Sequence, residues 1–351
     1  MSAPAETVLD VSGLRVGFRT EAGLVQAVDD VSFSLRRGEV LSIVGESGSG
    51  KSVSAMTLMG LTRSPNATIS GSATLADGTE LLTATEEQMR RVRGARIAMI
   101  FQDPMSALTA VYRVGDQIAE QILAHEKVSK KAARDRAVDL LGRVGIPRPK
   151  ERARAYPHEF SGGMRQRVMI AMALSCSPEI LIADEPTTAL DVTIQAQILD
   201  EIEELRTETG VGVLLITHDL GVVAEVADRV VVMYAGRVVE EAQLRELFKD
   251  PLHPYTWGLL GSVPRVDLAR PDRLPTISGS PPSLLRLPAG CHFITRCPHK
   301  MPICEIEPEL RTMDPEGGHP DRCHLELEAK RRLRFVDGAI GLPRLREAAT
   351  S

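Results

Sequence analysis

The sequence predicts an α/β fold, and three observations lead to this prediction. Two runs of consecutive apolar residues, at 180–183 and 213–216, are typical of strands that helices cover on both faces, as in a parallel sheet. A glycine-rich segment at 45–52 follows an apolar run and precedes a stretch compatible with a helix. Residues 102–176 carry many apolar side chains at spacings of three and four, which indicates helices.

The elements follow one another in an order that supports this fold. The first 40 residues or so alternate apolar and polar side chains, which is typical of strands, with turns at Gly23 and Gly38. Further buried strands are expected at 97–101 and 230–233. Helices are expected at 52–59, 117–125, 130–144 and 168–174.

Length, charge and composition narrow the class of protein. The chain has 351 residues, which is enough for two domains, and 43% of them are hydrophobic. A net charge of -5 argues against broad binding of nucleic acid. No apolar run approaches the ~18 residues of a transmembrane helix, and the first ten residues do not resemble a secretory signal. We therefore expect a cytosolic protein, which partners could still hold at a membrane.

The glycine-rich segment fits G-x-x-x-x-G-K-[ST], the pattern of a loop that binds the phosphates of ATP or GTP. Backbone N–H groups can approach phosphates where glycine lacks a side chain, and the helix that follows adds the positive end of its dipole. Lys51 is expected to reach the β- and γ-phosphates, and the Ser52 hydroxyl to bind Mg²⁺. The eight residues are Gly45, Glu46, Ser47, Gly48, Ser49, Gly50, Lys51 and Ser52.

Four polar residues follow predicted strands and are candidates for the chemistry. Asp184 and Glu185 end the strand at 180–183, and the carboxyl ends of parallel strands share one edge of a sheet with the phosphate loop. Asp184 is expected to hold Mg²⁺, and Glu185 to act as general base on the attacking water. His218 follows the next strand and is expected to contact the γ-phosphate. Gln102 is expected to contact Mg²⁺ or the attacking water.

A second anion site is expected at residues 161–163. Ser161, Gly162 and Gly163 precede an apolar helix, and a helix N-terminus attracts phosphate. The alternative interpretation is a simple N-cap. Two phosphate-binding helix ends in one chain would serve one nucleotide if two chains packed head to tail.

These motifs, in this order, resemble the ATP-binding subunit of an ABC transporter over residues 8–260. The resemblance implies a mixed sheet core, an antiparallel β subdomain and a helical subdomain at about 103–176, all within a domain of residues 1–260. It also implies a dimer in which each phosphate loop faces the partner's Ser161, Gly162 and Gly163, with Asp191 at the interface. Phe18 matches the aromatic residue that stacks on adenine in this family.

Segments 101–108 and 250–256, with Met164, narrow the resemblance to the ATPases of dipeptide and oligopeptide importers, whose close relatives import nickel. The resemblance implies three kinds of partner: a second ATPase subunit (a paralogue in preference to a second copy), two transmembrane permeases, and an extracytoplasmic solute-binding protein. It places the chain at the cytoplasmic face of the membrane. An importer of another small solute is one alternative, and a soluble ABC ATPase acting on nucleic acid or ribosomes is a rival of another class.

Four cysteines are clustered after a proline-rich linker at 261–290. Disulfides are disfavoured in the cytosol, so Cys291, Cys297, Cys304 and Cys323 suggest a metal site in a small extension at 291–330. Four thiolates can hold a [4Fe–4S] cluster, which the family resemblance favours. Zn²⁺ with mixed ligands and free packed thiols remain open, and nearby histidines would complete a zinc site. A charged tail is expected at 331–351.

Overall fold

The structure is a computed structural model, and it describes residues 6–103, 107–187, 192–263, 276–312, 318–336 and 339–342. The strands are β1 (Thr7–Thr20), β2 (Gly23–Arg36), β3 (Val40–Val44), β4 (Ala67–Leu75), β5 (Ile97–Ile100), β6 (Ile180–Asp184), β7 (Gly212–Thr217), β8 (Arg229–Tyr234), β9 (Arg237–Gln243), β10 (Arg311–Thr312), β11 (Pro320–Asp321), β12 (Phe335–Val336) and β13 (Ala339–Ile340). The α-helices are α1 (Lys51–Leu58), α2 (Glu86–Val92), α4 (Val114–His125), α5 (Lys130–Arg143), α6 (Pro149–Arg152), α7 (Gly162–Ala173), α8 (Val192–Thr209), α9 (Leu220–Val226), α10 (Leu244–Lys249), α11 (Pro254–Gly261) and α12 (Leu327–Leu333). Short 3₁₀ turns are η1 (Pro157–Glu159) and η2 (Pro302–Glu305).

A mixed sheet forms the centre of the molecule, in the order β10-β11-β9-β8-β3-β7-β6-β5. Its strands from β8 to β5 are parallel, while β9 pairs antiparallel with β8. Every residue of β3, β6 and β7 is buried, which explains their continuous apolar runs. The predicted α/β fold is confirmed, and the parallel strands bring their carboxyl ends to one edge.

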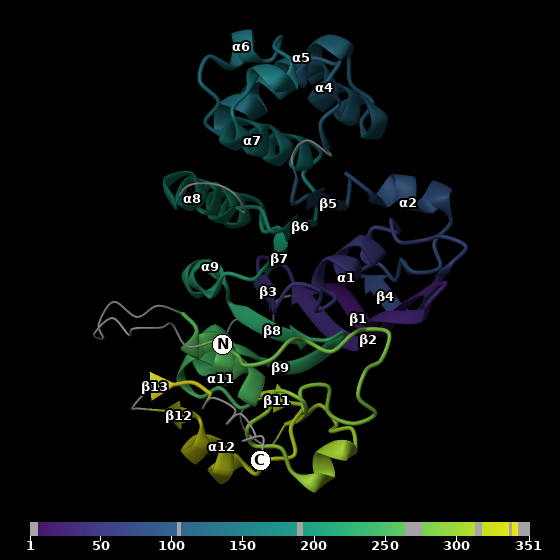
Figure 1. The fold of residues 1–351 in the computed structure, drawn as a ribbon. Helices are drawn as coiled ribbons and strands as arrows, with labels where there is room; N and C mark the ends of the chain where they lie inside the picture. Colours follow the sequence, from purple (N-terminus) through teal and green to yellow (C-terminus); the bar gives the residue numbers. More distant parts are fainter. Residues whose placement is uncertain are drawn as a thin grey trace.

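A second, antiparallel sheet has the order β2-β1-β4 and lies beside the central sheet (Figure 1). Its inward side chains alternate along the strands, as the sequence predicts, and Leu14, Val16 and Leu35 are fully buried. They share one core with residues of β3 and α1. This packing fixes the start of α1 against the antiparallel sheet.

The helices α4, α5, α6 and α7 form a group of their own, at the top of Figure 1. The apolar faces of α4, α5 and α7 meet in a core that includes Ile118, Ile122, Leu141 and Ile170, all fully buried. The helices predicted at 117–125 and 130–144 agree with α4 and α5. Within the described ranges, every helix is too short or too polar to span a membrane.

The cysteine-containing segment packs on the central sheet, so the prediction of a separate small cysteine-rich domain is not confirmed. Strand β11 extends the sheet through the pair Asp321 and Glu240. The Phe293 ring lies 5.2 Å from that of Tyr234 and 5.5 Å from that of Tyr255. Residues 264–275 of the predicted linker, 313–317 of the predicted extension, and 337–338 and 343–351 of the predicted tail lie outside the described residues. The domain boundaries stay predictions.

Candidate functional site

The phosphate loop lies between β3 and α1, at the carboxyl edge of the parallel strands. Gly45 has a φ of 155° and Gly50 a φ of 101°, which other residues rarely adopt. A Cβ atom on Gly50 would also lie 2.4 Å from the carbonyl oxygen of Ala27. Gly50 caps α1 without a side-chain hydrogen bond, so the first amides of the helix stay available to an anion.

Lys51 is buried at the start of α1, and its ammonium group donates to the loop itself. The acceptors are the carbonyl oxygens of Gly45 at 2.7 Å and of Glu46 at 3.0 Å. Burial lowers the pKa of Lys51, and the nearby carboxylates of Glu185 and Asp184 oppose that shift. The loop therefore encloses a cation at the position where the sequence predicts contact with phosphate.

The two residues predicted to hold Mg²⁺ from this edge meet directly. The Ser52 hydroxyl donates to Asp184 Oδ1 at 2.9 Å. Burial raises the pKa of Asp184, and the hydrogen bond from Ser52 opposes that shift. Hydroxyl and carboxylate oxygens are the donors that Mg²⁺ prefers, so this pair fits the ion. Gln102 is the third predicted Mg²⁺ ligand, and its amide donates to Glu185.

Gln102, Glu185 and His218 form one hydrogen-bonded group. Gln102 Nε2 donates to Glu185 Oε2 at 2.8 Å, and His218 Nδ1 lies 3.0 Å from Glu185 Oε1. Glu185 has a φ of 49°, an uncommon value for a residue with a side chain, and its amide donates to the carbonyl oxygen of Ile216. A tight turn after β6 therefore aims the carboxylate between its two partners, as expected of a positioned general base.

The second predicted anion site lies away from the phosphate loop. Ser161 caps α7 by accepting a hydrogen bond from the Met164 amide at 3.3 Å. Figure 1 shows α7 among the upper helices, while α1 lies beside the two sheets. Ser161, Gly162 and Gly163 line a different cavity of about 870 Å³, together with Ile194 of α8. The structure therefore does not bring them to the loop of the same chain, and Asp191 lies outside the described residues.

Phe18 lies in the antiparallel sheet. It pairs with Val25 of β2 and Ala67 of β4, and its half-buried side chain packs on the core beneath. Its stacking on adenine stays a prediction.

The four clustered cysteines line one small cavity, which we call the thiol cavity: Cys291, Cys297, Cys304 and Cys323. Burial raises the pKa of Cys297 to about 12 and also raises that of Cys291 and of Cys323, so these thiols are neutral at pH 7. Four sulfur donors suit a soft metal or a cluster. However, among the described residues no three His, Cys, Asp or Glu side chains are arranged to hold a metal ion. An iron–sulfur cluster is therefore not shown.

The histidines near the thiol cavity differ in their partners. His292, His319 and His324 each lie within 3.0 Å of an oxygen acceptor. His299 lines the cavity, and its buried Nε2 has no hydrogen-bond partner among the described residues. Burial lowers the pKa of His299, which favours the neutral imidazole that binds metals.

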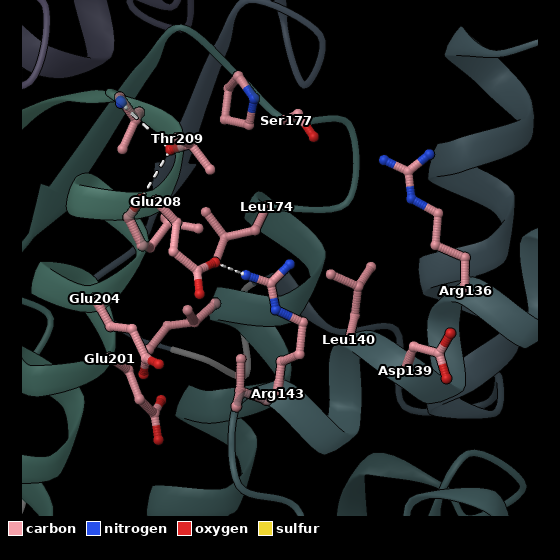
Figure 2. A pocket seen from close by; sticks show the side chains of 15 residues that line it. Arg136, Asp139, Leu140, Arg143, Leu174, Ser177, Glu201, Glu204, Glu208 and Thr209 are labelled. Atoms are coloured by element: carbon pink, nitrogen blue, oxygen red, sulfur yellow. Dashed lines mark hydrogen bonds and ion pairs between the residues drawn. The ribbon is translucent and has the colours of Figure 1, made fainter.

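Another cavity, of about 530 Å³, lies between α5, the end of α7 and the second half of α8 (Figure 2). Its polar lining includes Arg143, which forms an ion pair with Glu208, and the carboxylates of Glu201 and Glu204. It contains none of the predicted site residues, so we do not assign the nucleotide to it.

Two residues that the sequence analysis missed hold the phosphate loop from outside. Arg296 forms a two-pronged ion pair with the Glu46 carboxylate, and the Tyr255 hydroxyl accepts a hydrogen bond from the Glu46 amide. Their separations from Glu46 are 250 and 209 residues. No local pattern in the sequence signals contacts of that range.

Comparisons with known proteins identify a family for this chain. The family model "ABC transporter" matches residues 28–188, and the model "Oligopeptide/dipeptide transporter, C-terminal region" matches residues 239–304. The dipeptide transport ATP-binding protein DppD of Bacillus subtilis is 55% identical over 86% of this chain and 89% of its own length. The oligopeptide transport ATP-binding protein OppD of Salmonella typhimurium is 53% identical over 89% of this chain and 92% of its own.

A solved structure agrees with the fold. The ATP-binding cassette MJ0796, solved as a dimer in a post-hydrolysis state with ADP and Pi, has a TM-score of 0.61 and 26% identity. The match covers 68% of this chain and 99% of that one. Identity of 53–55% over 86–89% of the chain, together with the fold, shows that this chain belongs to the family of dipeptide and oligopeptide ABC transporter ATP-binding subunits.

Proposed function

We propose that this chain hydrolyses ATP to drive the import of peptides through partner permease subunits. One observation carries the proposal: Glu185 is held between Gln102 and His218, beside the paired Ser52 and Asp184. The relatives that share most of the chain are dipeptide and oligopeptide transport ATP-binding proteins by name.

Each site residue has a separate task in this mechanism. Lys51 and the loop amides bind the β- and γ-phosphates. Ser52 and Asp184 would hold Mg²⁺, which would supply positive charge to the phosphates. Glu185 accepts the proton of the attacking water. Gln102 and His218 fix the orientation of that carboxylate, because each lies on one of its two oxygens.

The proposed assembly has two ATPase subunits. The partner ATPase, a paralogue in preference to a second copy, would receive Ser161, Gly162, Gly163 and Asp191 of this chain over its own phosphate loop. The distance between α7 and α1 in one chain supports this arrangement (Figure 1). Two permeases and an extracytoplasmic solute-binding protein complete the transporter, with this chain on the cytoplasmic face of the membrane.

Peptide uptake into vesicles that contain the complete transporter tests the function. We expect uptake of di- or oligopeptides that requires ATP on the side of this chain and stops with Glu185→Gln. Uptake of nickel or another small solute in place of peptides would overturn the peptide assignment. DNA affinity that falls steeply with salt, without uptake of any solute, would favour the nucleic-acid rival.

We also propose that the thiol cavity holds a [4Fe–4S] cluster, with Zn²⁺ as the alternative. Four sulfur donors on one cavity and the unpartnered His299 Nε2 support a bound group. The test is iron, zinc and acid-labile sulfide analysis of protein purified without oxygen. We expect about four iron atoms and four sulfides per chain, lost in Cys297→Ser. Stoichiometric zinc would support the alternative, and no metal would overturn both.

A further inference from the structure

Arg296 of the C-terminal segment contacts the phosphate loop directly. Its Nη1 donates to Glu46 Oε2 at 2.6 Å, and its Nη2 donates to Glu46 Oε1 at 3.0 Å. Glu46 is the second residue of the loop, directly after Gly45. A parallel two-pronged pair of this kind fixes the orientation of both side chains as well as their distance.

The Arg296 side chain is buried, and its other N–H groups are also hydrogen-bonded. The side chain is 3% exposed. Its remaining N–H groups donate to the carbonyl oxygens of Ser278 and Ile277, and to the Tyr234 hydroxyl at 3.4 Å. All five donors therefore have acceptors, which only a guanidinium can provide in this geometry.

The backbone of Glu46 is held from the same side. Its amide donates to the Tyr255 hydroxyl at 2.8 Å. The Tyr255 ring is fully buried and lies 4.6 Å from that of Tyr234, at the end of β8. Phe293 packs against both rings, three residues before Arg296. The side chain and the amide of Glu46 thus depend on α11, β8 and the C-terminal segment.

Glu46 also contacts the phosphate-binding lysine. The Lys51 ammonium group donates to the Glu46 carbonyl oxygen at 3.0 Å. A continuous set of polar contacts therefore runs from Arg296 through Glu46 to Lys51. A shift of Glu46 would change the position of the carbonyl group that Lys51 uses.

We propose that Arg296 is a positioning residue for ATP binding, which holds the phosphate loop in its binding conformation through Glu46. The proposal rests on the ATP binding proposed above. If the binding conformation is populated only in part, the apparent affinity falls by that fraction. Arg296 raises that fraction by restricting Glu46, without touching the nucleotide.

A buried ion pair is by itself weak evidence for a stabilising role, because desolvation offsets most of the attraction. A positioning role requires the ion pair to lie on the phosphate loop itself, because a pair elsewhere on the sheet could stabilise the fold without affecting the loop. Arg96 and Glu179 form a comparable two-pronged pair, at 3.1 and 3.2 Å, before β5 and β6 and so at the opposite ends of the strands. That pair provides a matched control.

The test measures the Kd of a fluorescent ATP analogue and the melting temperature for Arg296→Gln, Glu46→Gln, the double variant and the control Arg96→Gln. We expect about tenfold weaker binding for each single variant at the loop. The double variant is expected to bind ATP no more weakly than either single variant, because the two substitutions remove the same Arg296–Glu46 contact. Arg96→Gln is expected to lower the melting temperature without changing the Kd.

The steady-state constants separate positioning from catalysis. Arg296→Gln is expected to raise KM for ATP with little change in kcat. Arg296→Lys is expected to recover only part of the lost affinity, because a lysine ammonium group lacks the planar, two-pronged geometry of the guanidinium. An unchanged Kd with a lowered melting temperature would show a purely structural role, and an additive loss in the double variant would show separate roles. Either result overturns the proposal.

A further variant covers the case in which Arg296→Gln does not fold. Tyr255→Phe keeps the buried ring and removes only the hydroxyl that accepts from Glu46, and we expect about threefold weaker ATP binding. An unchanged Kd in this variant would also count against the proposal. Failure of the unsubstituted chain to bind ATP would remove the proposed function together with this inference.

Discussion

The nucleotide site and the thiol cavity lie on the same central sheet, but their polar groups are held differently. In the nucleotide site, Lys51, Ser52 and Glu185 each bond to a group supplied by another part of the site. In the thiol cavity, four cysteine side chains line one small space, and the buried His299 Nε2 has no hydrogen-bond partner among the described residues. The first site is assembled by strands β3, β6 and β7, whereas the second lies on chain with little regular structure.

This difference in hydrogen bonding shows which of the two sites is formed by the folded chain without a ligand. The end of β6 and the start of α1 place Asp184 and Ser52 in contact before any ligand binds, so ATP would meet a preorganised site. Cysteine binds a metal as the thiolate, so metal binding in the thiol cavity would release protons and would contribute to the folding of that segment. The four predictions below test this comparison, from the largest expected effect to the smallest.

Glu185→Gln tests whether the assembled site does the chemistry. Loss of the general base is expected to lower kcat of the ATPase about a thousandfold, while the amide keeps the shape of the side chain and ATP still binds. Single-turnover hydrolysis and the ATP Kd measure the two effects separately. Residual activity within tenfold of the unsubstituted chain would assign the base to another residue.

Gly50→Ala tests the preorganisation of the phosphate loop. The new Cβ would meet the Ala27 carbonyl oxygen at 2.4 Å at a φ of 101°. We expect a loss of about 3 kcal/mol in the free energy of unfolding, measured by chemical denaturation. Gly162→Ala is the control, because no atom lies within 4 Å of its Cβ, and its stability should change by less than about 0.5 kcal/mol.

Metal removal tests the thiol cavity. Chelation of the purified protein is expected to speed proteolytic cleavage within residues 276–325 about tenfold, because the segment would lose its bound group. Mass spectrometry of the fragments locates the cuts. Cleavage that is equally fast before and after chelation would mean that packing on the sheet alone holds this segment.

Glu201→Gln tests a half-buried carboxylate away from the phosphate loop and the thiol cavity, whose Oε1 forms an ion pair with Arg167 at 2.8 Å. Burial raises the pKa of Glu201 to about 7, with Arg167 opposing, and its Oε2 has no partner among the described residues. The folded chain therefore holds this proton more tightly than the unfolded chain, whose pKa is near 4.5. Its contribution is complete below pH 4.5 and is lost as the pH rises through 7.

The expected size of this effect is small. The two pKa values alone would give about 2.5 kcal/mol between pH 5 and 8. Solvent screening of this half-buried carboxylate reduces the expected loss of stability, relative to Glu201→Gln, to about 1 kcal/mol. Urea denaturation of both chains at four pH values gives the difference, in which the titration of all other groups cancels. A constant difference across this range would place the pKa of Glu201 near its ordinary value.

Local sequence patterns predict most of the strands and the residues at their ends. Contacts between segments that are far apart in the sequence could not be predicted. The runs at 180–183 and 213–216 identify β6 and β7, and the strand-end rule predicts that Asp184, Glu185 and His218 meet. The pairing of β11 with β9, and the hold of Arg296 on Glu46, join segments that are far apart in the sequence. Neither leaves a periodic signal, because the cysteine-containing segment has little regular structure.

Arg296 is joined by a peptide bond to Cys297, a member of the thiol cavity. Binding free energies are reciprocal, so if a group bound in the thiol cavity strengthened ATP binding through Arg296, bound ATP would strengthen the binding of that group by the same factor. A nucleotide on this chain would thus slow hydrogen exchange at the amides around Cys297. The cell's ATP level and the chemistry of its thiols would then act on one shared equilibrium.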